Sequence, residues 1–462
     1  MKAAEDTIFA LSTAPGRAGI AVLRLSGPAA GTALEALAGT ALPPPRVARL
    51  ARLEDPETRA AIDRGLVLWI PGPASFTGED MAELHLHGGR AVTAAALEAL
   101  ARRPGLRPAE PGEFTRRAFD HGKLDLAEVE GLADLIDAET EAQRRQALRQ
   151  MSGHLSGLVQ GWRARLLPLL AHLEATIDFP DEGLPESLAR EVVAETGALA
   201  GEIAGHLADR GRGERLREGL QVAIIGPPNS GKSSLLNALA RRDVAIVSAT
   251  AGTTRDVIEV HLDLAGYPVT LADTAGLRDL AAEGGDGVER EGLRRARLRA
   301  AEADLKLAVF DLAAIDHTSW LDLDPQALAL VDAETLVVLN KADLKPPNMV
   351  NPEAVGGRPA FVLSAKTGQG LGALVDELTR QVAERLGLPG AAPAITRLRH
   401  RQALEDCRAA LERAQEAGQE AGLPELAAED LRLALRALGR LTGQVDVEDI
   451  LDVIFRDFCI GK

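Results

Sequence analysis

The sequence predicts a multidomain protein that combines α/β domains with an all-α domain, and three observations support this fold class. The chain has 462 residues, more than one ordinary hydrophobic core accommodates. Strand-like and helix-like segments alternate up to residue 119 and again from 218 to 379. The remaining segments show helical spacing alone. We therefore expect an α/β domain (1–119), a helical segment (120–217), a second α/β domain (218–379) and a second helical segment (380–462).

The N-terminal segment is expected to form a sheet with helices between its strands. Strand-length apolar runs occupy 19–25, 66–70 and 82–87. Alternation along the third run places Glu83 and its neighbours His85 and His87 on one face of the strand. Three interpretations of this polar face stay open: a ligand site, a solvated surface, or a metal site that uses the two histidines.

Helical spacing begins near Leu124, where Leu126, Val129 and Leu132 share one apolar stripe, and it returns after Thr379. A domain is readily inserted into another where its own ends lie close together. We therefore expect one discontinuous helical domain that is interrupted by the second α/β domain.

The composition predicts a cytoplasmic protein without a membrane anchor. No apolar run approaches the length of about 20 residues that spans a bilayer, and the first ten residues lack the charge pattern of a secretory signal. The two cysteines do not make a disulfide framework. A net charge of −16 opposes nucleic-acid binding by the whole surface. Local RNA contacts or solvated helix faces remain alternatives for three arginine groups: Arg144 and Arg145; Arg212, Arg215 and Arg217; Arg397, Arg399 and Arg401.

A phosphate-binding loop is the strongest motif. Residues 226–233 have the sequence GPPNSGKS, which matches GxxxxGK[ST] and lies between an expected strand (221–225) and an expected helix (234–240). Backbone N–H groups of such a loop surround phosphate oxygens at a helix N-terminus. Lys232 is expected to reach the β- and γ-phosphates, and the Ser233 hydroxyl is expected to bind Mg²⁺.

Four further motifs follow in an order typical of P-loop GTPases. Thr253 and Thr254 lie where a switch loop places a threonine on Mg²⁺, and DTAG (273–276) follows a strand. In NKAD (340–343), Asp343 can accept two hydrogen bonds from guanine, whereas adenine presents an acceptor at one of those positions. SAK (364–366) completes the base site, so we expect GTP rather than ATP. The expected GTP-binding residues are Asn229, Ser230, Gly231, Lys232, Ser233, Ser234, Ser248, Ala249, Thr250, Ala251, Gly252, Thr253, Thr254, Asp273, Thr274, Ala275, Gly276, Asn340, Lys341, Asp343, Ser364, Ala365 and Lys366.

Hydrolysis requires a group other than the glutamine that orients water in Ras-like GTPases, because Leu277 occupies that position. Glu289 is a candidate, acting directly or through a bridging water. A cation bound with help from Asn229 could replace an arginine finger. Alternatively, the finger could be one of the arginines Arg255, Arg278 and Arg290.

With these residues identified, the whole chain resembles the TrmE (MnmE) family of tRNA-modification GTPases. The resemblance rests on the intact GTPase motifs together with family-like segments at 6–8, 15–20 (PGRAGI), 75–80 (SFTGED), 111–119 (PGEFTRRAF) and 458–462 (FCIGK). It implies an N-terminal domain that dimerises and binds a formyl- or methylene-tetrahydrofolate. It also implies K⁺-assisted GTP hydrolysis when the GTPase domains of two subunits meet.

The resemblance assigns individual residues to these ligands. It implies K⁺ ligation by Asn229, Ser248, Thr250 and Thr253, Mg²⁺ ligation by Ser233 and Thr254, catalysis by Glu289, and folate binding by Arg24, Glu83, Lys123 and Lys462. Cys459 is implied either as a nucleophile or as a residue near the one-carbon group. Two features depart from the family: Ser248 replaces a common threonine, and the stretch 280–287 before Glu289 is longer and rich in glycine.

The implied activity is tRNA modification. With an FAD-containing partner, GidA (MnmG), in a heterotetramer, such an enzyme adds an aminomethyl or carboxymethylaminomethyl group to the wobble uridine of certain tRNAs. The alternative is a regulatory GTPase switch in ribosome assembly. The acidic composition favours a tRNA contact supplied partly by the partner.

Overall fold

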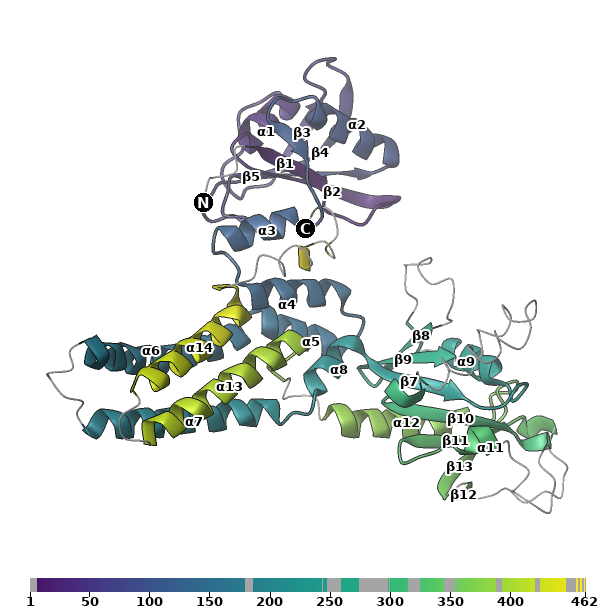
Figure 1. Cartoon of the computed structure of the whole chain (residues 1–462). Coiled ribbons are helices and arrows are strands. Elements are labelled where there is room, and N and C mark those ends of the chain that lie inside the picture. The colour runs from purple at the N-terminus through teal and green to yellow at the C-terminus, as the bar shows by residue number, and fades with distance from the viewer. Residues whose placement is uncertain are drawn as a thin grey trace, which may run out of the picture. The chain divides into compact units, whose positions relative to one another are not determined.

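The computed structural model describes residues 6–178, 186–242, 244–246, 259–273, 298, 300–314, 325–344, 354–355, 357–387, 393–419, 424–445, 454–455, 458 and 461. Figure 1 shows their helices and strands. The chain divides into two compact units. Unit 1 contains Met1–Ala133, Gln150–Thr196 and Ala409–Lys462, and unit 2 contains Asp134–Arg149 and Gly197–Arg408.

A six-stranded sheet in the order β3-β4-β5-β2-β1-β6 forms the N-terminal part of unit 1. Helices α1 (Ala30–Ala38) and α2 (Arg90–Ala101) pack on one face, where Leu34 and Leu100 meet Leu23 and Leu84. Helix α3 (Glu113–Asp120) covers part of the other face. The strands are β1 (Thr7–Leu11), β2 (Ala18–Ser26), β3 (Arg49–Glu54), β4 (Ala61–Ile70), β5 (Met81–Gly88) and β6 (Leu106–Pro108).

The three strands expected in this region are confirmed as β2, β4 and β5, although β4 begins earlier, at Ala61. The alternation along β5 is confirmed as well. Leu84 and Leu86 are buried beneath the helices, whereas Glu83 and His85 are only partly buried on the opposite face.

The helical segments are present where helical spacing predicted them. In unit 1, α6 packs lengthwise against α14, with Leu166 and Leu438 buried and Arg163 donating to the carbonyl of Leu435 over 3.1 Å. The described part of the chain contains no helix long and apolar enough to span a membrane. The helices are α4 (Leu126–Asp137), α5 (Glu141–Met151), α6 (His154–Asp178), α7 (Glu186–Leu207), α8 (Arg212–Glu218), α13 (Leu398–Gln419) and α14 (Pro424–Thr442).

Unit 2 contains a seven-stranded sheet in the order β12-β13-β11-β10-β7-β9-β8. Its five inner strands are parallel, and β12 and β8 are antiparallel edge strands. The strands are β7 (Leu220–Ile225), β8 (Glu259–Leu264), β9 (Tyr267–Asp273), β10 (Leu305–Asp311), β11 (Thr335–Asn340), β12 (Ala354–Val355) and β13 (Arg358–Val362). The accompanying helices are α9 (Lys232–Ala240), η2 (Leu312–Ala314), α11 (Pro325–Leu328), η4 (Ala342–Leu344) and α12 (Leu371–Leu386).

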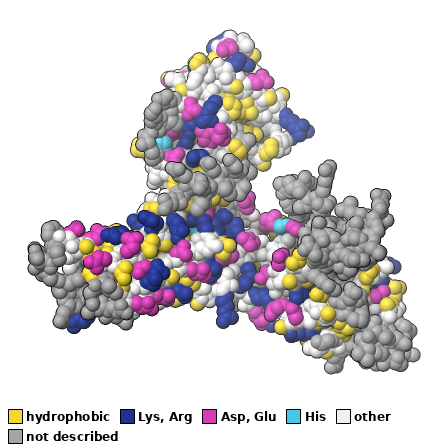
Figure 2. All heavy atoms as spheres, viewed as in Figure 1, with side chains coloured by type: hydrophobic (Ala, Val, Ile, Leu, Met, Phe, Trp, Pro, Cys, Tyr) yellow, Lys and Arg dark blue, Asp and Glu magenta, His cyan; other side chains and the backbone are white. Residues whose placement is uncertain are grey.

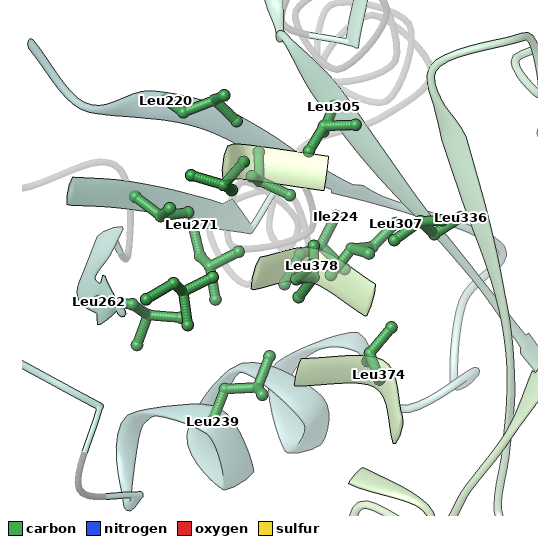
Figure 3. Close-up of a cluster of buried hydrophobic side chains, with 14 of the residues drawn as sticks. Leu220, Ile224, Leu239, Leu262, Leu271, Leu305, Leu307, Leu336, Leu374 and Leu378 are labelled. Atoms are coloured by element: carbon green, nitrogen blue, oxygen red, sulfur yellow. The ribbon is translucent and has the colours of Figure 1, made fainter. Parts of the chain in front are cut away.

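The main core of unit 2 lies between one face of this sheet and helices α9 and α12. Figure 3 shows Leu239 from α9 and Leu374 and Leu378 from α12 beside strand residues such as Ile224 and Leu271. Helix α12 continues to Leu386, which belongs to the same core. The expected domain boundary at residue 379 therefore falls inside a helix.

Candidate nucleotide site and second ligand site

The parallel strands of unit 2 bring the predicted nucleotide motifs to one edge of the sheet. Ile224 of β7 is the register partner of Asp273, the last residue of β9. Asp311 at the end of β10 pairs with Asn340 at the end of β11. Loops at the carboxyl edge of parallel strands are the usual ligand-binding position in such sheets.

The loop between β7 and α9 has the backbone of a phosphate cradle. Asn229 and Gly231 have positive φ angles of 60° and 91°. The Lys232 ammonium lies inside the loop and donates to the carbonyls of Gly226, at 3.0 Å, and Pro227, at 2.8 Å. The Ser230 hydroxyl is buried without a hydrogen-bond partner among the described residues. A buried hydroxyl and a buried ammonium in one loop fit an anionic ligand.

Asn340 connects this loop to the predicted base-binding loop. Its side-chain amide donates to the Ser230 carbonyl over 3.0 Å, and its Oδ1 accepts the backbone N–H of Ala365 over 3.0 Å. A Cβ atom at Gly231 would overlap the Asn340 amide, so glycine is required for this close approach. Asn340 thus positions backbone and has little surface left for a ligand, being 2% exposed.

Asp343 is exposed beside Asn340 and is available to a base. The Ser364 hydroxyl donates to Asp343 Oδ1 over 2.6 Å. This hydrogen bond, aided by the charges of Lys366 and Lys341, lowers the pKa of the Asp343 carboxyl despite some desolvation. The carboxylate is therefore ionised at neutral pH, as a group that accepts hydrogen bonds from guanine must be.

Asp311 is a site residue that sequence reasoning missed. Its Oδ2 lies 2.6 Å from Lys341 Nζ, and Lys341 has a positive φ of 64°. The ion pair fixes the lysine next to Asp343. The position of Asp311 at the end of a buried apolar strand was the signal that could have identified it.

Part of the predicted nucleotide site lies outside the described residues. For Asp273 only the strand backbone is described. Ser233 and Ser234 lie in the first turn of α9, which begins at Lys232, two residues before the expected start, and Lys366 follows β13. The predicted residues outside the description are Ser248, Ala249, Thr250, Ala251, Gly252, Thr253, Thr254, Thr274, Ala275, Gly276 and Glu289.

A second candidate site lies on the N-terminal sheet. Arg24 of β2 and Glu83 of β5 are register partners, and the guanidinium contacts Glu83 Oε1 at 3.0 and 3.1 Å. The guanidinium also lies 5.7 Å from the ring centre of Phe76 and 5.9 Å from that of Phe114. His85 Nε2 is 3.1 Å from the other Glu83 oxygen. Charged groups flanked by aromatic rings suit a ligand with both polar and planar parts.

The other described parts of the predicted folate set lie on neighbouring segments. Lys123 donates from Nζ to the carbonyl of Pro73, in the loop that also carries Phe76. Gly461 accepts a 2.9 Å hydrogen bond from the Ser12 hydroxyl, two residues beyond Ala10, which pairs with Arg24. The chain end therefore approaches the β1–β2 edge of this site. Cys459 and Lys462 themselves lie outside the described residues.

The two histidines of β5 each contact a carboxylate, and they do not contact each other. His85 contacts Glu83, and His87 Nδ1 lies 2.9 Å from Asp63. Within the described ranges, no group of three His, Cys, Asp or Glu side chains is placed to hold a metal ion.

The arginine groups considered for RNA contact are engaged in ion pairs. Arg401 contacts Asp209 and Glu214, and Arg397 contacts Asp134 at 2.6 Å. Arg144 and Arg145 likewise pair with Glu141. Basic and acidic side chains are interspersed over the visible surface (Figure 2). These pairs favour a structural role for the arginines.

Comparisons with known proteins identify relatives of the whole chain. A family model described as "MnmE helical domain" matches residues 126–459, and one described as "GTP-binding protein TrmE N-terminus" matches residues 7–123. Proteins named "tRNA modification GTPase MnmE" from Paramagnetospirillum magneticum and Parvibaculum lavamentivorans are 59% and 58% identical, over 99% of this chain and 100% of each relative.

A human relative is named as a mitochondrial 5-taurinomethyluridine-tRNA synthase subunit, and it is 51% identical over 99% of this chain and 93% of its own length. A solved structure of Era from Aquifex aeolicus is 26% identical over 41% of this chain and 66% of that chain, with a TM-score of 0.26. The family assignment therefore rests on the sequence relatives.

Proposed function

Because this chain belongs to the TrmE (MnmE) family of tRNA-modification GTPases, we propose that it modifies the wobble uridine of certain tRNAs together with an FAD-dependent partner of the GidA (MnmG) type. It is a GTP-hydrolysing enzyme. The added group is aminomethyl or carboxymethylaminomethyl, a reduced folate supplies its one-carbon unit, and the reaction takes place in the cytoplasm. The proposal rests on one observation: Lys232, Asn340 and Asp343 converge at one edge of the sheet in unit 2. The same chain also has a second charged site around Arg24.

GTP occupies the edge of the sheet in unit 2. Lys232 and the loop N–H groups bind its phosphates, and the Asp343 carboxylate binds its guanine. Ser233 at the start of α9 holds Mg²⁺ together with Thr254. The buried Ser230 hydroxyl and the lowered pKa of Asp343 support this assignment.

Hydrolysis is assisted by K⁺ and occurs when two GTPase domains meet. Asn229 ligates the ion with Ser248, Thr250 and Thr253, and Glu289 activates the water. The exposed position of Asn229 in the phosphate loop supports this role.

The reduced folate, a formyl- or methylene-tetrahydrofolate, binds at Arg24, Glu83, Lys123 and Lys462, with Cys459 nearby. Phe76, which is only partly buried, lies over the Arg24 guanidinium, and this supports binding of a planar ring system. The hydrogen bond between Ser12 and Gly461 supports participation of the chain end.

The protein acts as a homodimer and forms a heterotetramer with its FAD-dependent partner. Leu50 and Leu66 are cross-strand partners on β3 and β4 and are 54% and 43% exposed, which supports dimerisation through the N-terminal sheet. The domains are 1–119, a discontinuous helical domain whose first segment is 120–217 and whose second segment follows α12, and an inserted GTPase domain that starts near 218 and ends with α12 at Leu386 instead of 379.

Reconstitution tests the proposal. Purified protein is incubated with the FAD-loaded partner, unmodified tRNA, GTP, K⁺, methylene-tetrahydrofolate and a nitrogen donor, which is ammonium for an aminomethyl product or glycine for a carboxymethylaminomethyl product. Wobble nucleosides are analysed by mass spectrometry. We expect modification that requires every component and is lost in Arg24→Leu. Arg64→Leu is the matched control, because Arg64 is exposed on the same sheet. If GTP is hydrolysed but omission of folate changes nothing, the ribosome-assembly switch replaces this proposal. Equal hydrolysis rates in K⁺ and Na⁺ would remove Asn229 from its role.

A further inference from the structure

Two of the family-like segments, residues 75–80 and 111–119, meet beside the proposed folate site in unit 1. Each contributes an aromatic ring near the Arg24 guanidinium. The ring centre of Phe76 lies 5.7 Å from the guanidinium carbon, and Phe76 is partly buried. The ring centre of Phe114 lies 5.9 Å from it, and Phe114 is fully buried. Of these two rings, Phe76 is therefore the one that a ligand can contact.

The loop between β4 and β5, residues 71–80, carries Phe76 and also anchors the lysine of this site. The carbonyl of Pro73 accepts a hydrogen bond from Lys123 Nζ over 3.1 Å. The position of the loop relative to Arg24 thus determines where the aromatic ring and the ammonium group lie. Misplacement of such groups by about 1 Å can cost an enzyme about a hundredfold.

Buried hydroxyl groups attach this loop to the strand that carries Arg24. The Ser26 hydroxyl donates to Glu79 Oε2 over 2.7 Å and lies 2.7 Å from the Thr77 hydroxyl. Ser26 and Thr77 are fully buried. Ser26 is two residues after Arg24 on β2 and therefore lies on the same face of the strand. The Glu79 carboxylate is thus held from the strand side.

Arg117 of helix α3 holds the same carboxylate from the helix side. Its Nη1 lies 3.2 and 3.1 Å from the two Glu79 oxygens, and its Nη2 contacts Asp6 at 2.8 Å and Glu113 at 3.1 Å. The Arg117 and Glu79 side chains are only 7% and 10% exposed. Removal of one member of a buried pair leaves the other as an unpaired buried charge, which is strongly unfavourable. The pair therefore fixes the loop on α3.

His121, which follows the last residue of α3, makes a second contact with the loop. Its Nδ1 lies 2.8 Å from the carbonyl of Thr77 and 2.8 Å from the carbonyl of Arg117. A Cβ atom at Gly78 would lie 3.0 Å from the Cβ of His121, and Gly78 has a φ of 82°. The loop and the end of the helix are therefore packed too closely for a side chain at this position.

From these contacts we propose that Arg117 and Glu79 are positioning residues of the folate site, because their buried ion pair fixes the loop that carries Phe76. The inference rests on the proposed folate site. Both side chains act through the loop 71–80 and not by contact with the ligand. Loss of the pair should therefore weaken folate binding more than an equal loss of stability elsewhere in the same domain.

Arg107 provides the matched control. It pairs with Asp6 and Glu113, the same two carboxylates that Arg117 contacts, but none of its contacts within the described residues involves the loop 71–80. Arg107→Gln should therefore destabilise the same part of the domain without releasing the loop. This variant separates a loss of stability from a loss of loop position.

The test measures binding of formyl-tetrahydrofolate to each full-length variant by titration calorimetry, together with its melting temperature. The variants are Arg117→Gln, Glu79→Gln, the combination of the two, and Arg117→Lys, with Arg107→Gln as control. Ser26→Ala is added as a milder change, because it removes only the hydroxyl contacts to the loop. The reconstituted modification reaction gives kcat and the KM for methylene-tetrahydrofolate.

Arg117→Gln and Glu79→Gln should each raise the dissociation constant of the folate about tenfold, and their combination should raise it no further, because both act through one pair. The KM should rise by a similar factor with little change in kcat. Arg117→Lys keeps a positive charge beside Glu79 and should recover part of the affinity. Ser26→Ala should weaken binding about twofold to fivefold. Arg107→Gln should bind as wild type does, despite a lower melting temperature.

Equal weakening of folate binding in Arg107→Gln and Arg117→Gln would overturn the positioning role alone, as would wild-type affinity in Arg117→Gln. Should the variants of the pair not fold, wild-type affinity in Ser26→Ala would overturn it. If wild type binds no formyl-tetrahydrofolate, or if Arg24→Leu binds it as tightly as wild type, the proposed folate site is wrong as well.

Discussion

The side-chain amide of Asn340 donates to the backbone carbonyl of Ser230 over 3.0 Å, although 110 residues separate the two positions. The same side chain accepts the N–H of Ala365. One buried amide thus holds the phosphate loop and the base loop in a fixed relation. Phosphate and base binding should therefore depend on each other.

The first prediction concerns this amide. Asn340→Ala removes the hydrogen bonds to both loops and leaves buried polar backbone groups without partners. We expect affinity for GTP and GDP to fall together, roughly tenfold to a hundredfold. Titration with a fluorescent guanine nucleotide measures the change. Asn237→Ala, on the exposed side of α9, is the control and should bind as wild type does. A loss confined to GTP would contradict a role in joining the loops.

The second prediction concerns base selectivity at Asp343. Replacing its carboxylate by the amide in Asp343→Asn removes an acceptor for the guanine amine and introduces a donor. The preference for GTP over ATP should fall by about a hundredfold or more, and xanthosine triphosphate, which has a carbonyl in place of that amine, should bind better. Competition binding with the three nucleotides tests this. Asp376→Asn, on the exposed side of α12, should leave the selectivity unchanged.

The described nucleotide loops were predictable because each is defined by a short run of consecutive residues. GPPNSGKS carries its own strand and helix context, and the helix that it opens is present, although it begins at Lys232, two residues earlier than expected. The four residues NKAD are sufficient to identify Asp343 as a base contact, whatever residues surround it in the folded protein. The structural role of Asn340 was not predictable, because it depends on how three distant loops meet after folding.

Other features required tertiary information or a family resemblance. Strand β1 (Thr7–Leu11) escaped prediction because this short segment is buried on both faces and lacks alternation. The end of α12 was missed because its apolar spacing continues without a break from the sheet-covering part to Leu386. Arg24 and Lys123 carry no motif in the sequence, and only the resemblance pointed to them.

The third prediction tests the core that places α12 in unit 2. Leu378 is fully buried beside Ile224 and Leu307 (Figure 3). Leu378→Ala should lower the free energy of unfolding of this unit by about 2–5 kcal/mol, through lost burial and the cavity that remains. Calorimetry should show one destabilised transition, while Leu398→Ala, at a position 63% exposed, changes little. An unchanged transition in the Leu378 variant would place α12 outside the core.

The last prediction concerns the acid stability of unit 1. Burial opposes ionisation of Asp6 and Glu113, but hydrogen bonds and charge from Arg107 and Arg117 outweigh it and lower the pKa of both carboxyls. Their stabilising effect is complete above the unfolded-state values, near pH 4, and is lost as pH falls through the lower folded-state values. The wild-type melting temperature should therefore drop below about pH 4. Arg107→Gln should have a lower melting temperature than wild type at pH 7. Acidification should lower its melting temperature less than that of wild type, so that the two melting curves converge at low pH. The control Arg64→Gln, at an exposed position, should follow wild type. Parallel curves for the Arg107 variant and wild type would mean that the arginine does not set these pKa values.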